Sequence, residues 1–555
     1  MSCFKLPKGL IQEIETLICK FWWGYGGDNR KIHWVRWERL CEAKEVGVMG
    51  FKEIEKFNDA ILAKQVWRMM NNHDSLCYRV FEARFFPNGS IFDARESSLG
   101  SYAWKSILSA RDIIKKGAVW RIGDGQSVCI REDKWLPDKV FRKVSSPIPS
   151  IPPDAKVSSL IDANTGSWRA DFISQSFLPH EADLILSIPL SIRLPQDRLI
   201  WSPSSSGRFS TRSAYKLLVS SASASNAGSS NPNPQKNFWR GLWKLRVPSK
   251  VKNFAWRASN NALPTMDNLL RRKVVLSATC NICRIHVEDI THALCGCEGV
   301  KEAWMSLSWA NLTNTSPPLD FTDLMSKFLQ VHEDYRAEIF VLISWLLWNR
   351  RNLLRLNKPV HPLHVLPSLA GGILQDFINA QEPVPKPVAT SSTRHWCPPD
   401  QYWYKANYDG AVFKSSNTAG LGVVIRDWRG DILGALAVRI PLPHSVPEVE
   451  ALACRHAVSF AVDLGLQEII FEGDSAIINQ AITSGLSSTA LYGHIVDDVF
   501  HLTLQLRSYK FSQVPRCCNK VADAVAKKAR DGLDFKVWVD DVPGDIIPLA
   551  LFDVS

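Results

Sequence analysis

The sequence predicts a multidomain protein in which mostly α-helical parts are followed by a C-terminal α/β domain. Three observations support this fold class. The chain has 555 residues, which is enough for about two to four domains. A proline-rich stretch at 382–402 separates two long segments and is typical of a linker. After that stretch, strand patterns alternate with helical patterns, whereas helical patterns prevail before it.

The C-terminal segment is expected to form five strands with helices between and after them. Strand-like runs broken by turn residues lie at 404–413, 420–427, 432–440, 468–471 and 509–514. Helical periodicity predicts helices at 448–464, 476–483 and 520–530. Gly465 follows the first of these helices and is a typical helix stop.

Four acidic residues each lie at the end of an expected strand or on an expected helix: Asp409, Glu450, Asp474 and Asp523. Carboxylates that converge from separate elements offer the oxygen ligands that a pair of Mg²⁺ ions requires. Two such ions can activate a water and stabilise the leaving oxygen of a phosphodiester. Close carboxylates without metal repel one another, so some of them are expected to hold a proton at neutral pH.

Neighbouring acids compete with two members of this set. Glu448 and Glu450 lie two residues apart on a helix and point to different faces, so only one of them can serve the site. Glu472 and Asp474 lie two residues apart on a strand and share a face, so Glu472 is expected to support Asp474. The acidic pair Asp497–Asp498 lies in a helical stretch and is expected to face solvent.

A second group of ligands has the spacing Cys280-x₂-Cys283-x₈-His292-x₄-Cys297. Three thiolates and an imidazole at this spacing can close a tetrahedral zinc site. Because protein atoms fill all four positions, this zinc is expected to be structural. His286 and Cys295 are competing ligands, and free cysteines in a helical packing module are the alternative to a zinc site.

The charge distribution favours a polyanionic partner. The formal net charge is +11. Residues 403–535 hold 13 basic and 14 acidic side chains, so the positive excess lies before residue 403. Around the zinc motif, basic residues alternate with aromatic ones: Lys244, Arg246, Lys250, Lys252, Arg257, Arg271, Arg272 and Lys273. This pattern suits phosphate contact with base stacking, and it equally suits two amphipathic helices with solvated basic faces.

The acidic motifs resemble a known family. The words K-A-N-Y-D-G-A at 405–411, E-A-L-A at 450–453, F-E-G-D-S at 471–475 and N-K-V-A-D-A at 519–524 resemble the type 1 ribonuclease H domain of plant LINE-type (non-LTR) retrotransposon reverse transcriptases. The cysteine–histidine motif, with Trp304 behind it, is similar to the zinc-binding domain of the same proteins, and this spacing favours Cys297 over Cys295. R-F-S at 208–210 and S-A-Y at 213–215 match a word that precedes that domain.

The resemblance implies a ribonuclease H-like fold with a mixed sheet and a specific activity. The expected reaction is Mg²⁺-dependent endonucleolytic hydrolysis of RNA in RNA–DNA hybrids, with Asp409, Glu450, Asp474 and Asp523 as metal-binding catalytic residues and nucleic-acid binding by the zinc module. The family usually carries a histidine in the loop before the last helix, but residues 515–519 contain none. The alternatives are a catalytically inactive, domesticated nucleic-acid-binding protein and a DNA nuclease on the same fold.

No polymerase activity is expected. Reverse transcriptases require an aromatic-x-Asp-Asp hairpin within a palm domain, and the similar residues Trp538–Asp541 lie near the C-terminus, where an acidic turn is expected. The expected parts are a helical remnant that follows a palm (1–150), an irregular α+β segment (151–219), a linker (220–237), a zinc-binding domain (238–305), a helical segment (306–381), a linker (382–402), a ribonuclease H-like domain (403–533) and a tail (534–555).

Three further expectations concern the first 400 residues and the compartment. Residues 51–70 are expected to form an amphipathic helix, and 119–130 a hairpin with Asp124–Gly125 at its turn. The apolar run 339–348 is too short to span a bilayer and is expected to be a buried helix. Thirteen scattered cysteines and the absence of a signal peptide at 1–20 favour a reducing intracellular compartment, either nucleus or cytoplasm.

Overall fold

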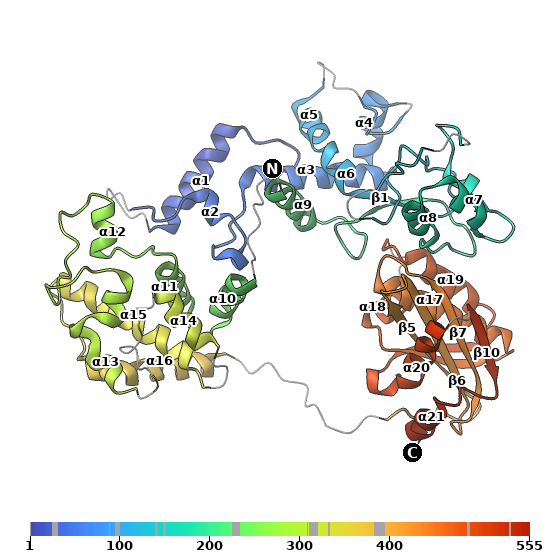
Figure 1. Ribbon diagram of the computed structural model, residues 1–555. Helices are drawn as coiled ribbons and strands as arrows, with labels where there is room; N and C mark the ends of the chain where they lie inside the picture. The colour runs from blue at the N-terminus through green and yellow to red at the C-terminus, as the bar shows by residue number, and fades with distance from the viewer. Residues whose placement is uncertain are drawn as a thin grey trace. The chain divides into compact units, whose positions relative to one another are not determined.

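The computed structural model describes residues 2–24, 32–87, 89–94, 100–138, 142–147, 151–224, 233–307, 309, 320–330, 334–381, 395–485, 489–531 and 534–554. It divides into two compact units, whose elements are labelled in Figure 1. Unit 1 comprises Met1–Lys5, Asp59–Ser221 and Thr390–Ser555, and unit 2 comprises Leu6–Asn58 and Ala222–Ala389. The expected parts are consecutive, whereas each unit combines separated stretches of chain. Much of both expected linkers, at 225–232 and 382–394, lies outside the described residues.

The C-terminal part of unit 1 is built on a six-stranded sheet in the order β10-β7-β6-β5-β8-β9. The strands are β5 (Tyr404–Phe413), β6 (Thr418–Arg426), β7 (Ile432–Pro441), β8 (Glu468–Gly473), β9 (Ser508–Gln513) and β10 (Phe535–Val539). β5, β6, β7 and β10 pair antiparallel, whereas β8 is parallel to β5 and β9 is parallel to β8. The mixed α/β fold is confirmed. The sheet has one strand more than expected, because β10 comes from the segment expected to be a tail.

Helices cover both faces of this sheet (Figure 1). They are α17 (Val446–Asp463), α18 (Ala476–Thr483), α19 (Gly493–Thr503), α20 (Lys520–Lys528) and α21 (Ile547–Val554). On β6, Val423 and Ile425 point to the core formed with α17, α18 and α19, and Val424 points to the core formed with α20 and α21. This alternation follows from the period of two of a strand, and it explains why the middle of β6 is apolar on both faces.

Two glycines in β6 allow α20 to lie close to the sheet. A Cβ atom at Gly422 would collide with backbone atoms of Ala522 and Ala526, and one at Gly420 would collide with the carbonyl of Ala526. Only glycine permits such a close backbone approach. These contacts fix the helix that carries Asp523 against the centre of the sheet.

The N-terminal part of unit 1 is largely helical. Its helices are α3 (Ile54–Asn71), α4 (Leu76–Phe85), α5 (Tyr102–Ser109), α6 (Arg111–Gly117), α7 (Ala170–Ser176), α8 (Pro179–Leu186) and α9 (Thr211–Ala224), with short strands β2 (Ile161–Asp162) and β3 (Ser167–Trp168). The helix expected at 51–70 is confirmed as α3. Trp104 and Trp201 are fully buried in the core of this part.

The hairpin expected at 119–130 is wrong. β1 (Ala118–Arg121) pairs antiparallel with β4 (Arg198–Trp201), which lies almost eighty residues later in the chain. The carboxylate of Asp197, just before β4, accepts the N–H groups of Gly123, Gly125 and Ser127 at 2.7, 3.0 and 2.9 Å. These backbone N–H groups are therefore bonded to the side chain of Asp197, and they do not form the hydrogen bonds that a hairpin would require.

Residues 118–207, called here the docked segment, bind the sheet domain of the same unit through a buried polar contact. Asp498 on α19 accepts from Ser191 Oγ at 2.6 Å, from Ile192 N–H at 3.1 Å and from Arg455 Nη1 at 3.1 Å. The prediction that Asp498 faces solvent is therefore wrong, since this residue is fully buried. The sequence around Asp498 does not show that a segment three hundred residues earlier in the chain covers this face of α19.

Unit 2 is a helical domain with one large core. Its helices are α1 (Lys8–Trp22), α2 (Trp37–Leu40), α10 (Asn233–Lys244), α11 (Ser249–Ser259), α12 (Met266–Arg271), α13 (Lys301–Met305), α14 (Phe321–Leu329), α15 (Arg336–Arg355) and α16 (Leu366–Ala380). The core joins Trp239, Trp256, Phe340 and the thiols of Cys280 and Cys297. The buried helix expected at 339–348 is confirmed as part of α15. Within the described residues, no helix is both long and apolar enough to span a bilayer.

Candidate functional site

Three of the four predicted carboxylates converge in unit 1. Asp409 lies on β5, Glu450 on α17, and Asp474 directly after β8. Each offers one carboxylate oxygen such that these atoms all lie within 4.8 Å of one another. Asp409 is 6% exposed and Glu450 is 8% exposed. The three residues form what we call the carboxylate cluster.

The local fold explains this convergence. β5 and β8 are parallel neighbours with Asn407 opposite Glu472, so Asp409 and Asp474, each two residues further on in the same direction, lie beside one another. Gly410 has no room for a side chain, because a Cβ atom there would lie 2.7 Å from Val449 Cγ1. The missing side chain lets α17 approach β5, and Glu450 follows Val449 directly.

Burial and mutual repulsion disfavour charge on these carboxylates. Burial, followed by the negative charge of Asp474, raises the pKa of Asp409 to about 7. Burial, followed by the charges of Asp409 and Asp474, raises the pKa of Glu450 to about 9. Among the described residues, no group forms a hydrogen bond with the buried Glu450 Oε2. An orphaned oxygen beside two other carboxylates fits a divalent cation, which would stabilise the charged forms.

The fourth predicted residue, Asp523, does not join the cluster. It lies on α20, and its Oδ2 accepts from Lys527 Nζ at 2.6 Å, one helical turn further along. Its charge nevertheless contributes to the raised pKa of Asp409 and of Glu450. The structure therefore places Asp523 within electrostatic reach of the cluster, with its carboxylate paired to a lysine.

The competing acids have other partners. Glu448 Oε2 accepts from the N–H and Oγ of Ser445 at 2.9 and 2.8 Å, which is a capping box at the start of α17. Glu472 binds Lys405 Nζ at 2.9 Å and Asn407 Nδ2 at 3.1 Å. Neither residue belongs to the carboxylate cluster.

The four predicted zinc ligands also converge, in unit 2. Suitable atoms of Cys280, Cys283, His292 and Cys297 lie within 4.8 Å of one another. Sγ of Cys280 lies 3.9 Å from Sγ of Cys297, and Sγ of Cys283 lies 3.4 Å from Nε2 of His292. Tetrahedral zinc with ordinary bond lengths separates two sulfurs by about 3.8 Å and a sulfur from a nitrogen by about 3.6 Å. The donor types and their spacing therefore fit zinc.

The competing ligands lie outside this set. The thiol of Cys295 is buried in the core of unit 2. The ring of His286 lies 5.7 Å from the ring of His292. The carbonyl of His286 instead accepts the N–H of Cys280 at 2.8 Å and holds the two sides of the ligand loop together.

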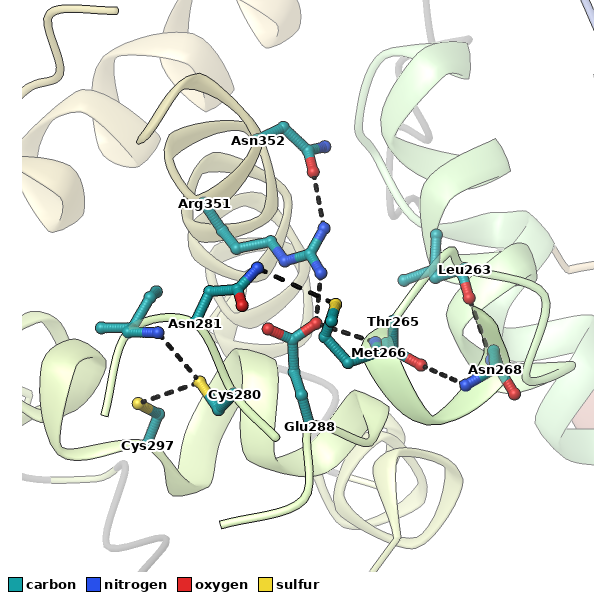
Figure 2. Close-up of polar contacts among 11 residues, drawn as sticks. Leu263, Thr265, Met266, Asn268, Cys280, Asn281, Glu288, Cys297, Arg351 and Asn352 are labelled. Atoms are coloured by element: carbon teal, nitrogen blue, oxygen red, sulfur yellow. Dashed lines mark hydrogen bonds and ion pairs between the residues drawn. The ribbon is translucent and has the colours of Figure 1, made fainter. Parts of the chain in front are cut away.

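A buried ion pair, which the sequence did not reveal, anchors this loop to its surroundings (Figure 2). Glu288 lies between the ligands Cys283 and His292, and its Oε1 accepts from Arg351 Nη2 on α15 and from Met266 N–H at 3.1 Å. Glu288 and Arg351 are 1% and 2% exposed. In the sequence, Arg351 is one of several arginines of this helix, and nothing there marks it as buried or identifies its partner.

Several basic residues of unit 2 lie over aromatic rings of the same unit. Lys250 Nζ lies 4.7 Å from the ring centroid of Trp345, and Lys44 Nζ lies 5.4 Å from that of Trp243. Arg272 lies 5.9 Å from that of Trp34. These rings are therefore in contact with cations of the same unit. The side chains of Arg271, Arg272 and Lys273 are also exposed to solvent.

Two family models match the chain. A family described as reverse transcriptase-like matches residues 407–529. A family described as zinc-binding in reverse transcriptase matches residues 209–304. The first match contains all four predicted carboxylates, and the second contains all four predicted zinc ligands.

Two proteins of Arabidopsis thaliana are similar in sequence. One, named "Putative ribonuclease H protein", is 25% identical over 554 residues, which cover 95% of this chain and 86% of the relative. The other, named as an uncharacterized mitochondrial protein, is 37% identical over 140 residues, which cover 25% of this chain and 91% of the relative.

Solved structures of ribonucleases H are also similar to part of the chain. RNase H1 of Halobacterium salinarum NRC-1 has 25% sequence identity and a TM-score of 0.22, and the match covers 23% of this chain and 98% of that one. LC11-RNase H1 in complex with an RNA/DNA hybrid has 21% identity and a TM-score of 0.21, with 23% and 96% covered.

Proposed function

Because the chain belongs to the reverse transcriptase-derived proteins of plants that join a zinc-binding segment to a ribonuclease H-like domain, we propose that its C-terminal domain hydrolyses the RNA strand of RNA–DNA hybrids with magnesium. One observation carries this proposal: the oxygens of Asp409, Glu450 and Asp474 lie within 4.8 Å of one another at one edge of the sheet. No structural need of the fold explains why Asp409 and Glu450 are buried beside Asp474, where burial and the neighbouring charges raise the pKa of both.

The carboxylate cluster would hold the magnesium ions. Bound magnesium supplies Lewis-acid stabilisation of the charges that develop on the attacking and leaving oxygens. Asp409 and Glu450, whose pKa values are raised, would bind it in their charged forms, and the ion would supply the partner that Glu450 Oε2 lacks. Asp523 would complete the second ion's ligands after its carboxylate leaves Lys527. The 2′-hydroxyls and the wide minor groove of the hybrid would identify the RNA strand.

Cleavage of a labelled hybrid tests the proposal. Asp474→Asn keeps the shape of the side chain and removes its charge, so hydrolysis in Mg²⁺ should fall at least 100-fold. Asp463→Asn is the matched control, because Asp463 is an exposed carboxylate at the far end of α17. Equal and negligible cleavage by the wild type and Asp474→Asn would exclude the nuclease.

A second candidate function is nucleic-acid binding without catalysis. The pairing of Asp523 with Lys527 favours it, because this carboxylate is not among the clustered ligands. The absence of a histidine at 515–519 favours it as well. A protein of this kind would bind the hybrid with the same affinity before and after Asp474→Asn and would cleave it in neither form. Duplex DNA as a competitor and as a substrate separates both candidates from a DNA nuclease.

We further propose that unit 2 binds one structural zinc ion and contacts nucleic acid through its exposed basic residues. The cysteine and histidine donors and their tetrahedral spacing support the zinc. The positive excess before residue 403 supports the polyanionic partner. Metal analysis of the purified protein should find one zinc per chain. Affinity for a hybrid should fall steeply as salt is raised.

A further inference from the structure

The loop between β9 and α20 is fixed beside the carboxylate cluster at both of its ends. At its start, Val514 N–H donates to the carbonyl of Gly473 at 3.0 Å, and Gly473 directly precedes Asp474. At its end, Asn519 Nδ2 donates to the carbonyl of Tyr408 at 2.9 Å, and Tyr408 directly precedes Asp409. Each end of the loop is thus bonded to the residue that directly precedes a member of the carboxylate cluster.

Buried side chains hold the second anchor in place. Asn519 is 1% exposed, and its Oδ1 accepts from Asn407 Nδ2 at 3.3 Å. Asn407 itself donates to Glu472, which is bound to Lys405. The path of residues 514–519 is therefore determined by the strands that carry the cluster, and the loop has little freedom to move away from it.

Arg516 is the exposed cation of this loop. It lies midway between the two anchors, and its side chain is exposed. Within the described part of the chain, no carboxylate lies within ion-pair distance of its guanidinium. Its positive charge acts on the cluster, because it lowers the pKa of Asp409 and of Glu450 against the larger effects that raise them. A free guanidinium therefore stands at the rim of an acidic site.

We propose that Arg516 binds a phosphate group of the nucleic-acid strand at the carboxylate cluster and positions it for hydrolysis. This inference rests on the proposed nuclease function and names a residue for its substrate. Three carboxylates repel a phosphodiester, and a cation at the rim offsets that repulsion. A guanidinium also binds two phosphate oxygens at once with a fixed geometry, which an ammonium group does not.

The test compares Arg516→Ala and Arg516→Lys with the wild type and with Arg507→Ala. Arg507 is a matched control because it is an exposed arginine just before β9, at the end opposite to Val514 and about 20 Å from it along the strand. Single-turnover cleavage of a labelled RNA–DNA hybrid in Mg²⁺ should fall about 10- to 100-fold in Arg516→Ala. Arg516→Lys should retain an intermediate rate, and Arg507→Ala should match the wild type.

Two measurements separate phosphate binding from a structural role. In magnesium-free buffer, Arg516→Ala should bind a fluorescein-labelled hybrid more weakly, with the slope of log affinity against log salt reduced by about 1. Its affinity for Mg²⁺, measured from the magnesium-dependent rise in unfolding temperature, should equal or exceed that of the wild type, because a positive charge beside the carboxylates is removed.

The outcomes distinguish failure of this inference from failure of the proposed function. If the wild type does not cleave the hybrid, the nuclease proposal is wrong, and the binding measurement still decides the role of Arg516. Equal hybrid affinities and salt slopes for the wild type and Arg516→Ala overturn the inference. A loss of Mg²⁺ affinity as large as that of Asp474→Asn also overturns it, because Arg516 would then maintain the metal site itself.

Discussion

At the scale of single residues, the carboxylate cluster opposes the stability of the fold that contains it. Glu450 is 8% exposed, and burial together with Asp409 and Asp474 raises its pKa to about 9. The unfolded chain would ionise this group near its ordinary pKa of 4.5. Between these two values the native state binds more protons than the unfolded state, so metal-free stability falls as pH rises through this range.

Glu450→Gln should therefore stabilise the metal-free protein, and more so at alkaline pH. The amide cannot ionise, so the stability of the variant does not fall with pH through this group. The wild type loses stability at pH 8.5, because its unfolded chain is ionised while its native state still holds the proton, and at pH 5.5 the difference between the two proteins is much smaller. Unfolding temperatures in magnesium-free buffer at both pH values measure this, with an expected gain of about 3–6 °C at pH 8.5. Asp463→Asn is the control, and a gain independent of pH would contradict the argument.

The sequence could predict the cluster because each of its members is placed by local structure. Asp409 lies on a strand with a clear pattern, Asp474 directly follows another, and Glu450 lies on a helix with clear periodicity. The sequence could not predict the burial of Asp498 or the pairing of Glu288 with Arg351. Their partners lie on segments far apart in the chain, and no local pattern specifies which charge meets which.

At the scale of elements, the last twenty residues are part of the sheet domain. β10 extends the sheet by pairing with β7, and α21 packs over the face that α20 covers. The sequence predicted the limits of β5 to the residue but missed β10. The side chains of Phe535–Val539 are mostly exposed, because this strand lies at the sheet's edge, and an edge strand has a weak alternating pattern.

A buried ion pair makes the C-terminal helix necessary for stability. Asp553 on α21 lies 3.3 Å from Arg426 Nη2, and their side chains are 4% and 1% exposed. The Arg426 guanidinium also lies over Trp396, 3.7 Å from the ring centroid. Asp553→Ala leaves this arginine buried without its counter-charge, so the free energy of unfolding of unit 1 should fall by about 3–5 kcal/mol.

Urea unfolding, followed by hydrogen exchange of peptides from β6 and β7, measures this loss. Asp545→Ala is the control, because the side chains of Asp545 and its partner Lys528 are 62% and 31% exposed, and removal of such a surface pair has little effect on stability. Equal losses in the two variants would show that Arg426 finds another partner or solvent.

At the scale of the whole molecule, the ribonuclease H-like domain does not stand alone in its unit. The docked segment buries Asp498 and also places the carbonyl of Pro189 2.9 Å from Nε2 of the buried His494. Gly207 approaches Thr489 so closely that a side chain at this position would collide with its carbonyl. Together these contacts make residues 118–207 a structural part of the domain that carries the cluster.

Asp498→Ala should loosen the docked segment. The substitution removes the counter-charge of the half-buried Arg455 and deprives Ser191 and the N–H of Ile192 of their acceptor, a loss of about 2–4 kcal/mol. Limited proteolysis should therefore cut within residues 118–207 earlier than in the wild type, whereas Asp463→Asn should leave the cleavage pattern unchanged. Unchanged proteolysis in Asp498→Ala would mean that apolar contacts alone hold the segment.

The two units have separate cores, so the loss of zinc should affect one of them selectively. The core of unit 2 contains Cys280 and Cys297 themselves, whereas the cores of unit 1 contain none of the zinc ligands. A chelator would remove the proposed zinc from its four ligands, and structural zinc contributes directly to folding free energy.

We therefore expect calorimetry to show two transitions, of which a chelator or Cys280→Ser lowers only one. Hydrogen exchange should assign the lowered transition to peptides of α11 and α15, while peptides of β5 and β6 keep their protection. Cys77→Ser is the control, because Cys77 is an exposed cysteine of unit 1. If chelation lowered the protection of β5 as much as that of α15, the units would unfold together, and the zinc would support the carboxylate cluster as well as its own domain.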